Sequence, residues 1–151
     1  MRITKAFGVV AAIALAGGGT WFFARLTAIA PETATPAATL VTPGAFMVEV
    51  RLPPTLAAEA ATGKTYYDAV CASCHGANAA GQDGVAPPLV HKIYEPLHHG
   101  DAAFVVAVRN GTREHHWSFG SMKPLEQPLT DAEIAAIIRY VRELQRENGI
   151  M

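Results

Sequence analysis

The sequence predicts an all-α fold of three or more helices, preceded by an apolar amino-terminal helix and a tether rich in proline and alanine. Two observations favour this class. Segments with helical periodicity carry start and stop signals, and glycine- and proline-rich loops separate them. No segment pattern predicts a sheet. With 151 residues, of which 50% are hydrophobic, the chain is long enough for one ordinary globular domain, with about fifty residues left outside that domain.

Charge and cysteine content exclude several classes of protein. The formal net charge is −1 and no block of lysine and arginine occurs, so the sequence gives no reason to expect nucleic acid as a partner. The chain has 2 cysteines, Cys71 and Cys74, which excludes a disulfide scaffold.

The amino-terminal segment, residues 1–30, predicts a membrane signal. Arg2 and Lys5 precede residues 6–24, which carry no charge. As a helix, that stretch would extend roughly 28 Å, nearly the thickness of a bilayer core. We expect an uncleaved anchor in the cytoplasmic membrane, with a cleaved secretory signal as the alternative. Either interpretation keeps the basic end in the cytoplasm and places the rest of the chain in the periplasm.

Residues 31–54 are predicted to form a linker. They contain five prolines and many small residues, and they lack a helical apolar stripe. Such a tether would reach between ~25 and ~75 Å, depending on its stiffness. Within it, residues 46–52 alternate well enough for a short strand or an extended segment lying on the domain.

Two helices are expected in the first part of the domain, which we place at residues 55–151. Thr55 follows two prolines and is expected to cap a helix that runs directly into the cysteines. Residues 101–111 predict a three-turn helix, with Asp101 at its start and Gly111 just beyond its end.

The last predicted helix has the strongest signals. Thr130 and Glu133 have the spacing of a capping box, and Gly149 ends the pattern. One apolar stripe runs along the helix and comprises Ile134, Ile137, Ile138, Val141 and Leu144.

Residues 71–76, CASCHG, contain the motif that predicts a chemical function. C-x-x-C-H is a signature of covalent haem attachment. At the end of a helix, this spacing lets two thiols add to the two vinyl groups on one haem edge, and His75 then lies beneath the iron. A thioredoxin-like redox pair would follow a strand, whereas a helix precedes this motif. A structural zinc site would need a second ligand pair, and no further cysteines exist.

From this motif onward the sequence resembles the class I c-type cytochromes, over about residues 55–150. GKTYYDAVCASCHG is similar to the helix that runs into the haem motif of that family, and GVAPPL is similar to its proline segment. The resemblance implies a cytochrome c fold around one haem c, covalently attached through Cys71 and Cys74. It also implies that Gly63 lets the first and last helices cross in close contact, with Tyr140 against it.

The same resemblance assigns further residues to the haem site. The backbone carbonyl of Pro87, twelve residues after His75, would accept the Nδ1 proton of that histidine and so direct Nε2 to iron. Leu89 would pack on the haem plane. Tyr67 is a candidate for a hydrogen bond into the pocket, although packing is the simpler interpretation.

Residues 114–124, EHHWSFGSMKP, are expected to supply the sixth ligand. Met122 lies in a glycine-containing loop before the last helix, where class I cytochromes place their methionine. One departure is Lys123, which separates Met122 from the expected proline. His115, His116 or a vacant position are the alternatives. Trp117 and Phe119 are expected to be walls of the pocket, or else ordinary packing under the loop.

The other histidines have no predicted role. HH occurs twice, at 98–99 and 115–116, and imidazole suits copper or zinc, so a second metal site is one interpretation. Neither pair has helical i, i+4 spacing or a carboxylate partner in sequence. Shaping the loop, or bonding a haem propionate, is the alternative for His115 and His116.

With His75 and Met122 bound, iron would have no free position, so substrate chemistry is blocked and one-electron transfer remains. The sequence therefore predicts a membrane-anchored electron carrier rather than an enzyme. Expected partners are a quinol-cytochrome c reductase, a terminal oxidase or a dehydrogenase. The alternative is a haem-containing subunit or sensor whose sixth ligand is labile.

Overall fold

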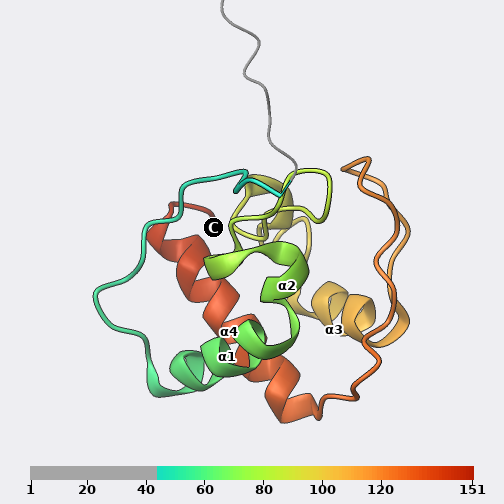
Figure 1. Ribbon diagram of the computed structural model, residues 1–151. Helices are drawn as coiled ribbons and strands as arrows, with labels where there is room; N and C mark the ends of the chain where they lie inside the picture. Colours follow the sequence, from blue (N-terminus) through green and yellow to red (C-terminus); the bar gives the residue numbers. More distant parts are fainter. Residues whose placement is uncertain (1–43) are drawn as a thin grey trace, which may run out of the picture. The chain divides into compact units, whose positions relative to one another are not determined.

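A computed structural model describes residues 44–151, and every regular element in that range is helical (Figure 1). The elements are α1 (Ala58–Val70), α2 (Ala72–His75), η1 (Ala77–Ala79), η2 (Lys92–Tyr94), α3 (Asp101–Asn110) and α4 (Asp131–Glu147). Within this range the chain forms isolated bridges but no strand, so the all-α prediction is confirmed.

The predicted membrane segment, residues 6–24 within 1–30, and the first part of the tether lie outside the described residues. Among the helices of residues 44–151, none combines the length and the apolar character that a membrane crossing requires.

The crossing of α1 and α4 organises the fold (Figure 1). At Gly63 the two backbones lie so close that a Cβ would be 1.8 Å from the carbonyl oxygen of Ala136. The expected close crossing at Gly63 is therefore present. Its partner is the backbone of Ala136, while Tyr140, one turn later, packs its ring on Tyr67 with centroids 5.4 Å apart.

The start of α1 differs from the prediction. The helix begins at Ala58 with Ala57 as its N-cap, and no side chain caps it, so Thr55 does not have the expected role. The amide of Ala57 donates instead to Glu143 Oε2 on α4 at 3.3 Å. Leu56 packs against the core, which keeps the preceding residues out of the helix.

α4 follows the sequence signals closely. Thr130 and Glu133 form the predicted capping box, with Thr130 N donating to Glu133 Oε2 at 2.7 Å and Glu133 N donating to Thr130 Oγ1 at 3.3 Å. The helix ends at Glu147, and Gly149 follows with a φ of +72°. All five residues of the predicted apolar stripe are buried.

The second half of the predicted linker lies on the domain as an extended segment. Met47 N donates to Ala80 O at 3.1 Å, and Arg51 exchanges hydrogen bonds with Asn148. Val50 packs against the core. Of the two interpretations of residues 46–52, the extended segment is the one observed. The boundary at residue 55 stays a prediction, since residues 44–54 make contacts of their own with the domain.

The core lies between α1, α4 and the loop after α2. Its buried residues come from each of these parts: Ala60, Tyr67, Ala79, Val90, Ile137, Tyr140, Val141 and Leu144. This core holds the end of α1 in place, and the C-x-x-C-H motif begins there.

Candidate functional site

The C-x-x-C-H motif forms a tight helical turn at the end of α1. Cys71 is the C-cap of α1, and the single turn α2, which the sequence did not predict as a separate helix, comes directly after it. The amides of Cys74 and His75 both donate to Cys71 O, at 3.1 and 2.9 Å. The two cysteines are not joined by a disulfide; Cys71 is half-buried and Cys74 is exposed. Burial, followed by the neighbouring Cys74, raises the pKa of Cys71 to about 11.

Sequence reasoning missed the contribution of Gln82 to this turn. Its Nε2 donates to Ala72 O at 3.2 Å and to Ser73 O at 2.9 Å. A glutamine in a glycine-containing loop gives no signal of this role, because the contact depends on how the loop folds back over α2.

His75 is held in one tautomer. Its Nδ1 lies 2.9 Å from Pro87 O, as the resemblance implied. A carbonyl oxygen only accepts, so Nδ1 carries the proton and Nε2 presents a lone pair. Burial lowers the pKa of His75, although the hydrogen bond to Pro87 opposes that shift. A neutral imidazole with a free Nε2 is the form that binds a metal.

The loop from 76 to 88 brings Pro87 over His75. Gly81 has a φ of +73°, and a Cβ there would lie 2.5 Å from Pro88 N. Only glycine allows both this conformation and this approach. Asn78 also has a positive φ, 54°, and its Oδ1 accepts from Tyr140 Oη at 3.0 Å.

The hydroxyl of Tyr67 is used within the same loop. It donates to the backbone, to Gly76 O at 2.9 Å, and a hydrogen bond from this hydroxyl into a haem pocket stays a prediction. Burial raises the pKa of Tyr67 far above its usual range. Leu89 packs against the core next to this loop, and its carbonyl accepts from Gln145 Nε2 at 2.8 Å. The position of Leu89 on a haem plane stays a prediction.

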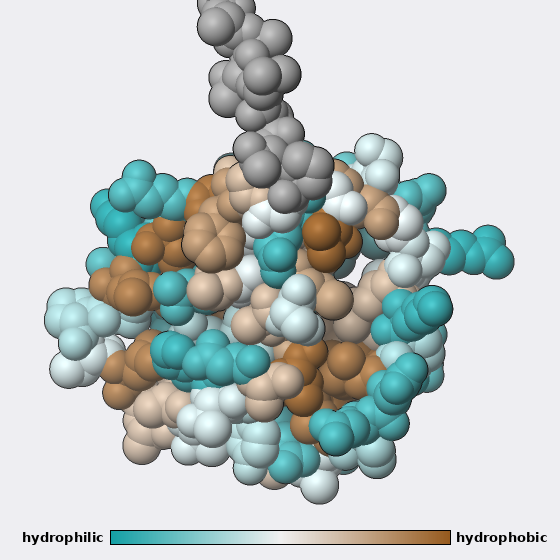
Figure 2. Space-filling model, viewed as in Figure 1, coloured by the Kyte–Doolittle hydropathy of each residue, from teal (hydrophilic) through white to brown (hydrophobic). Residues whose placement is uncertain are grey.

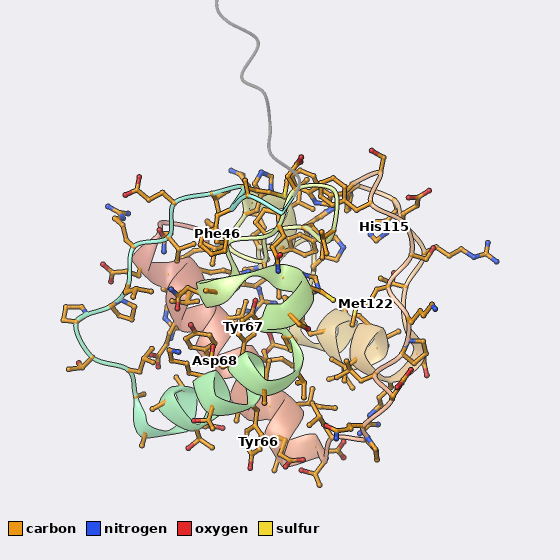
Figure 3. All side chains as sticks on the ribbon, viewed as in Figure 1. Phe46, Tyr66, Tyr67, Asp68, His115 and Met122 are labelled. Carbon is orange, nitrogen blue, oxygen red and sulfur yellow. The ribbon has the colours of Figure 1, made fainter. Side chains whose placement is uncertain are left out.

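Met122 closes a hairpin-like loop. Its carbonyl accepts from Thr112 N at 3.0 Å, and a Cβ on Gly111 would lie 2.4 Å from that oxygen. The side chain is half-buried, and Figure 3 labels it between α2 and α3. Pro124 lies against Gly111, just after the end of α3. The proline expected directly after Met122 thus stands one residue later in the sequence, and Lys123 between them is exposed.

Trp117 and Phe119 lie in this loop with their rings stacked 5.8 Å apart, and Trp117 meets His91 edge-on at 5.3 Å. Trp117 Nε1 is buried and makes no well-formed hydrogen bond within residues 44–151, although a weak interaction with the Tyr94 hydroxyl opposes the burial that raises the pKa of that tyrosine. A buried donor without a partner is costly, and a carboxylate such as a haem propionate would supply the missing acceptor. The residues present therefore fit a haem.

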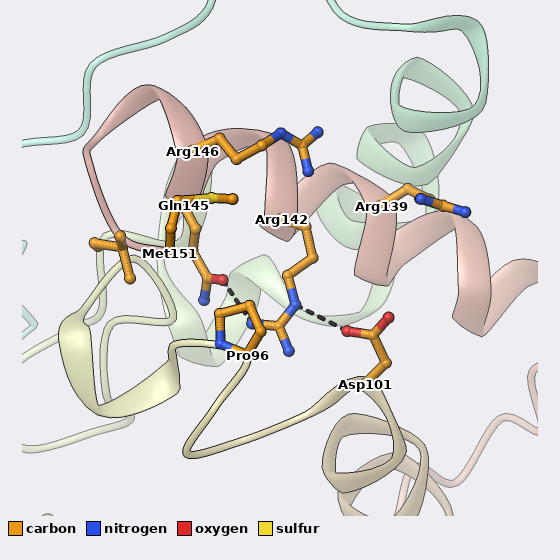
Figure 4. A pocket seen from close by; sticks show the side chains of 8 residues that line it. Pro96, Asp101, Arg139, Arg142, Gln145, Arg146 and Met151 are labelled. Carbon is orange, nitrogen blue, oxygen red and sulfur yellow. Dashed lines mark hydrogen bonds and ion pairs between the residues drawn. The ribbon is translucent and has the colours of Figure 1, made fainter.

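The face that contains α2 is hollowed beside it, and exposed hydrophobic side chains lie around it in separate patches (Figure 2). Two other cavities lie along α4, away from the C-x-x-C-H turn. The first has the ion pair between Arg142 and Asp101 in its wall (Figure 4). None of the predicted site residues lines either of these two cavities.

The structure also brings the two histidine pairs together, which sequence spacing did not reveal. His98 Nε2 lies 3.2 Å from His116 Nε2, and His99 Nε2 lies 3.3 Å from His115 Nε2. We call these four residues the histidine cluster.

Comparison with known proteins agrees with this geometry. The model of the family described as Cytochrome c matches residues 60–145, more than half of the chain. Subunit CcoP of the cbb3-type cytochrome c oxidase from Azospirillum brasilense is 40% identical over 94 residues, which are 58% of this chain and 29% of that protein. The cytochrome subunit of fructose dehydrogenase from Gluconobacter japonicus is 39% identical over 85 residues, 52% of this chain and 18% of that subunit.

A shorter match has a higher identity. Cytochrome c-554(547) from Halothiobacillus neapolitanus is 64% identical over 33 residues, 22% of this chain and 35% of that protein. The chain thus spans about a third or less of the length of each of these relatives. The match of the family model, together with the C-x-x-C-H turn and the oriented His75, shows that this chain belongs to the cytochrome c family and carries covalently bound haem c.

Proposed function

We propose that the chain is a one-electron carrier, or the electron-transfer subunit of a larger redox complex, in which His75 and Met122 would hold the haem iron. The observation that carries the proposal is the hydrogen bond from His75 Nδ1 to Pro87 O, because it fixes the one tautomer that can bind iron through Nε2. Bound haem supplies reversible one-electron chemistry, and a Met/His ligand pair raises its reduction potential.

Several residues of the chain would hold this haem, each through a different contact. Cys71 and Cys74 supply the two thioether attachments from one rigid turn, which Gln82 stabilises. Trp117 Nε1 offers a buried donor for a propionate. Met122 is supported as the opposite ligand by its place in the loop between α3 and α4, whose base is fixed by the bond to Thr112.

Partner and location form part of the proposal. Two of the relatives are named as subunits of an oxidase and of a dehydrogenase. We propose that this chain exchanges electrons with a quinol-cytochrome c reductase, a terminal oxidase or a dehydrogenase, and that residues 6–24 attach it to the cytoplasmic membrane with the haem domain in the periplasm. The apolar, uncharged character of residues 6–24 supports this attachment.

The test is the absorption spectrum of the haem-loaded full chain in mild detergent, in both redox states. We expect a methionine-to-iron charge-transfer band in the oxidised form and no change when carbon monoxide is added to the reduced form. Met122→Ala should abolish the band, lower the reduction potential and permit carbon monoxide binding. Met151→Ala removes an exposed methionine and is the matched control, for which the wild-type spectrum is expected.

Retention of the band in Met122→Ala would show that another side chain is the ligand. Ready carbon monoxide binding by the wild-type protein would instead support the alternative, a subunit or sensor with a labile sixth position.

A further inference from the structure

We infer that the histidine cluster, His98, His99, His115 and His116, is a second metal site that takes a zinc-class divalent cation, separate from the haem. The four residues come from two segments, one before α3 and one after it. One ring nitrogen from each of His98, His99 and His116 lies within 4.8 Å of the other two. His115 extends the group through its contact with His99.

The tautomers of two cluster members are set by backbone carbonyls. His99 Nδ1 lies 2.7 Å from Ile93 O, and His115 Nδ1 lies 2.8 Å from Arg113 O. Both carbonyls can only accept, so each Nδ1 carries the proton and each Nε2 bears a lone pair. This is the arrangement that metal-binding histidines use, with one ring nitrogen oriented by an acceptor and the other presented to the ion.

The two lone pairs then face each other at 3.3 Å, the distance from His99 Nε2 to His115 Nε2. Two neutral imidazoles in these tautomers repel at that distance, because neither nitrogen has a proton to donate. A cation between them removes the conflict. A shared proton would do so for one pair of rings, whereas a metal ion would satisfy all four.

Two of the nitrogen separations match tetrahedral coordination. Zinc binds imidazole nitrogen at about 2.0–2.1 Å, and tetrahedral geometry then separates the ligand nitrogens by about 3.3–3.4 Å. The observed separations are 3.2 Å for His98 and His116, and 3.3 Å for His99 and His115. Three of the four histidines are exposed, so an ion has access.

The surrounding structure holds both segments in place. Arg142 donates from NH2 to His99 O at 2.6 Å, and Glu95 O accepts from the amides of His98 and His99. In the other segment, Glu114 Oε2 accepts from Gly120 N at 2.8 Å and closes the loop that carries His115 and His116. An ion in the cluster would therefore join the segment before α3 to the loop that carries Met122.

The test uses the haem-loaded full chain in mild detergent at pH 7.5, without any histidine tag. Zinc is titrated against a chromophoric chelator, and zinc-edge X-ray absorption reports the ligand atoms. We expect one zinc per chain in an all-nitrogen shell of imidazoles, and a higher melting temperature with zinc. His99→Gln and His116→Gln should each weaken zinc binding at least about tenfold and abolish the thermal shift.

His91→Gln is the matched control, since His91 packs on Trp117 outside the cluster. It should bind zinc as the wild type does. The haem spectrum is recorded throughout and should not change with zinc or with either cluster variant. Absence of stoichiometric zinc binding, equal binding by His99→Gln and the wild type, or a change of the iron ligands in the cluster variants would each overturn the inference.

Discussion

Gly63 of α1 lies directly against the backbone of Ala136 in α4, where an added Cβ would be 1.8 Å from the Ala136 carbonyl oxygen and 3.0 Å from Ile137 N. These neighbours are backbone atoms of a helix, so they cannot move aside for an added methyl group as a flexible side chain could. The contact sets the separation of the two helices, and with it the position of the C-x-x-C-H turn that extends from α1.

Gly63→Ala is therefore expected to destabilise the protein by about 3 kcal/mol, the upper end of the usual cost of overpacking, even though alanine is the better helix former by about 1 kcal/mol. Urea unfolding of the haem-loaded protein measures this change. Gly100→Ala makes the same substitution where the nearest atom to the added Cβ, Pro96 O, is 3.5 Å away. Its cost should stay below about 1 kcal/mol, and equal effects at the two sites would contradict the packing argument.

Arg142 ties three parts of the fold together. Its side chain is 8% exposed and donates to Asp101 Oδ1 and to Gln145 Oε1 (Figure 4). It also donates to Tyr94 O and to His99 O. Arg142→Leu keeps the apolar stem but removes the guanidinium that donates to Gln145 Oε1 and to His99 O, whereas Tyr94 O keeps its bond from Gln145 Nε2, so we expect a loss of about 2–4 kcal/mol in unfolding free energy. Arg146→Leu is the control: that side chain is 47% exposed, and its effect should be within about 0.5 kcal/mol.

Tyr67→Phe tests the role of the Tyr67 hydroxyl. The structure gives this group a backbone partner, Gly76 O at 2.9 Å. We expect a loss of about 1 kcal/mol in unfolding free energy, because Gly76 O keeps a weaker bond from Ala79 N at 3.3 Å. The haem spectrum and reduction potential should stay as in the wild type. A clear shift in potential without loss of stability would favour the pocket interpretation of this tyrosine.

The sequence predicted most where a local signal decides the structure. The capping box of Thr130 and Glu133, the apolar stripe of α4 and the C-x-x-C-H turn are all encoded by spacing over a few residues. The expected start at Thr55 was wrong for a nonlocal reason, since the contacts of Ala57 with Glu143 and of Leu56 with the core determine where α1 begins.

The rest of the site depends on contacts between distant segments, which one sequence does not reveal. Gln82 reaches Ala72 and Ser73 only because the loop folds back over α2. The two histidine pairs are separated by α3 in sequence, yet their rings meet in space. Neither relationship has a periodic or spacing signal, so both had to come from the structure.

The capping box gives the stability a defined pH dependence. Hydrogen bonds from the backbone and the side chain of Thr130 lower the pKa of Glu133 below its ordinary 4.5. The stabilisation by the ionised carboxylate is fully present above pH 4.5, the unfolded value, and is lost as the pH falls through the lower value of the folded state. Glu133→Gln should therefore reduce the urea midpoint most at neutral pH, and its deficit should shrink steadily below pH 4.5. Glu126→Gln, in the loop before α4, removes the same charge outside the capping box and corrects for net charge. A deficit for Glu133→Gln that stays constant from pH 7 to pH 3 would show that the carboxylate's charge contributes nothing to the cap.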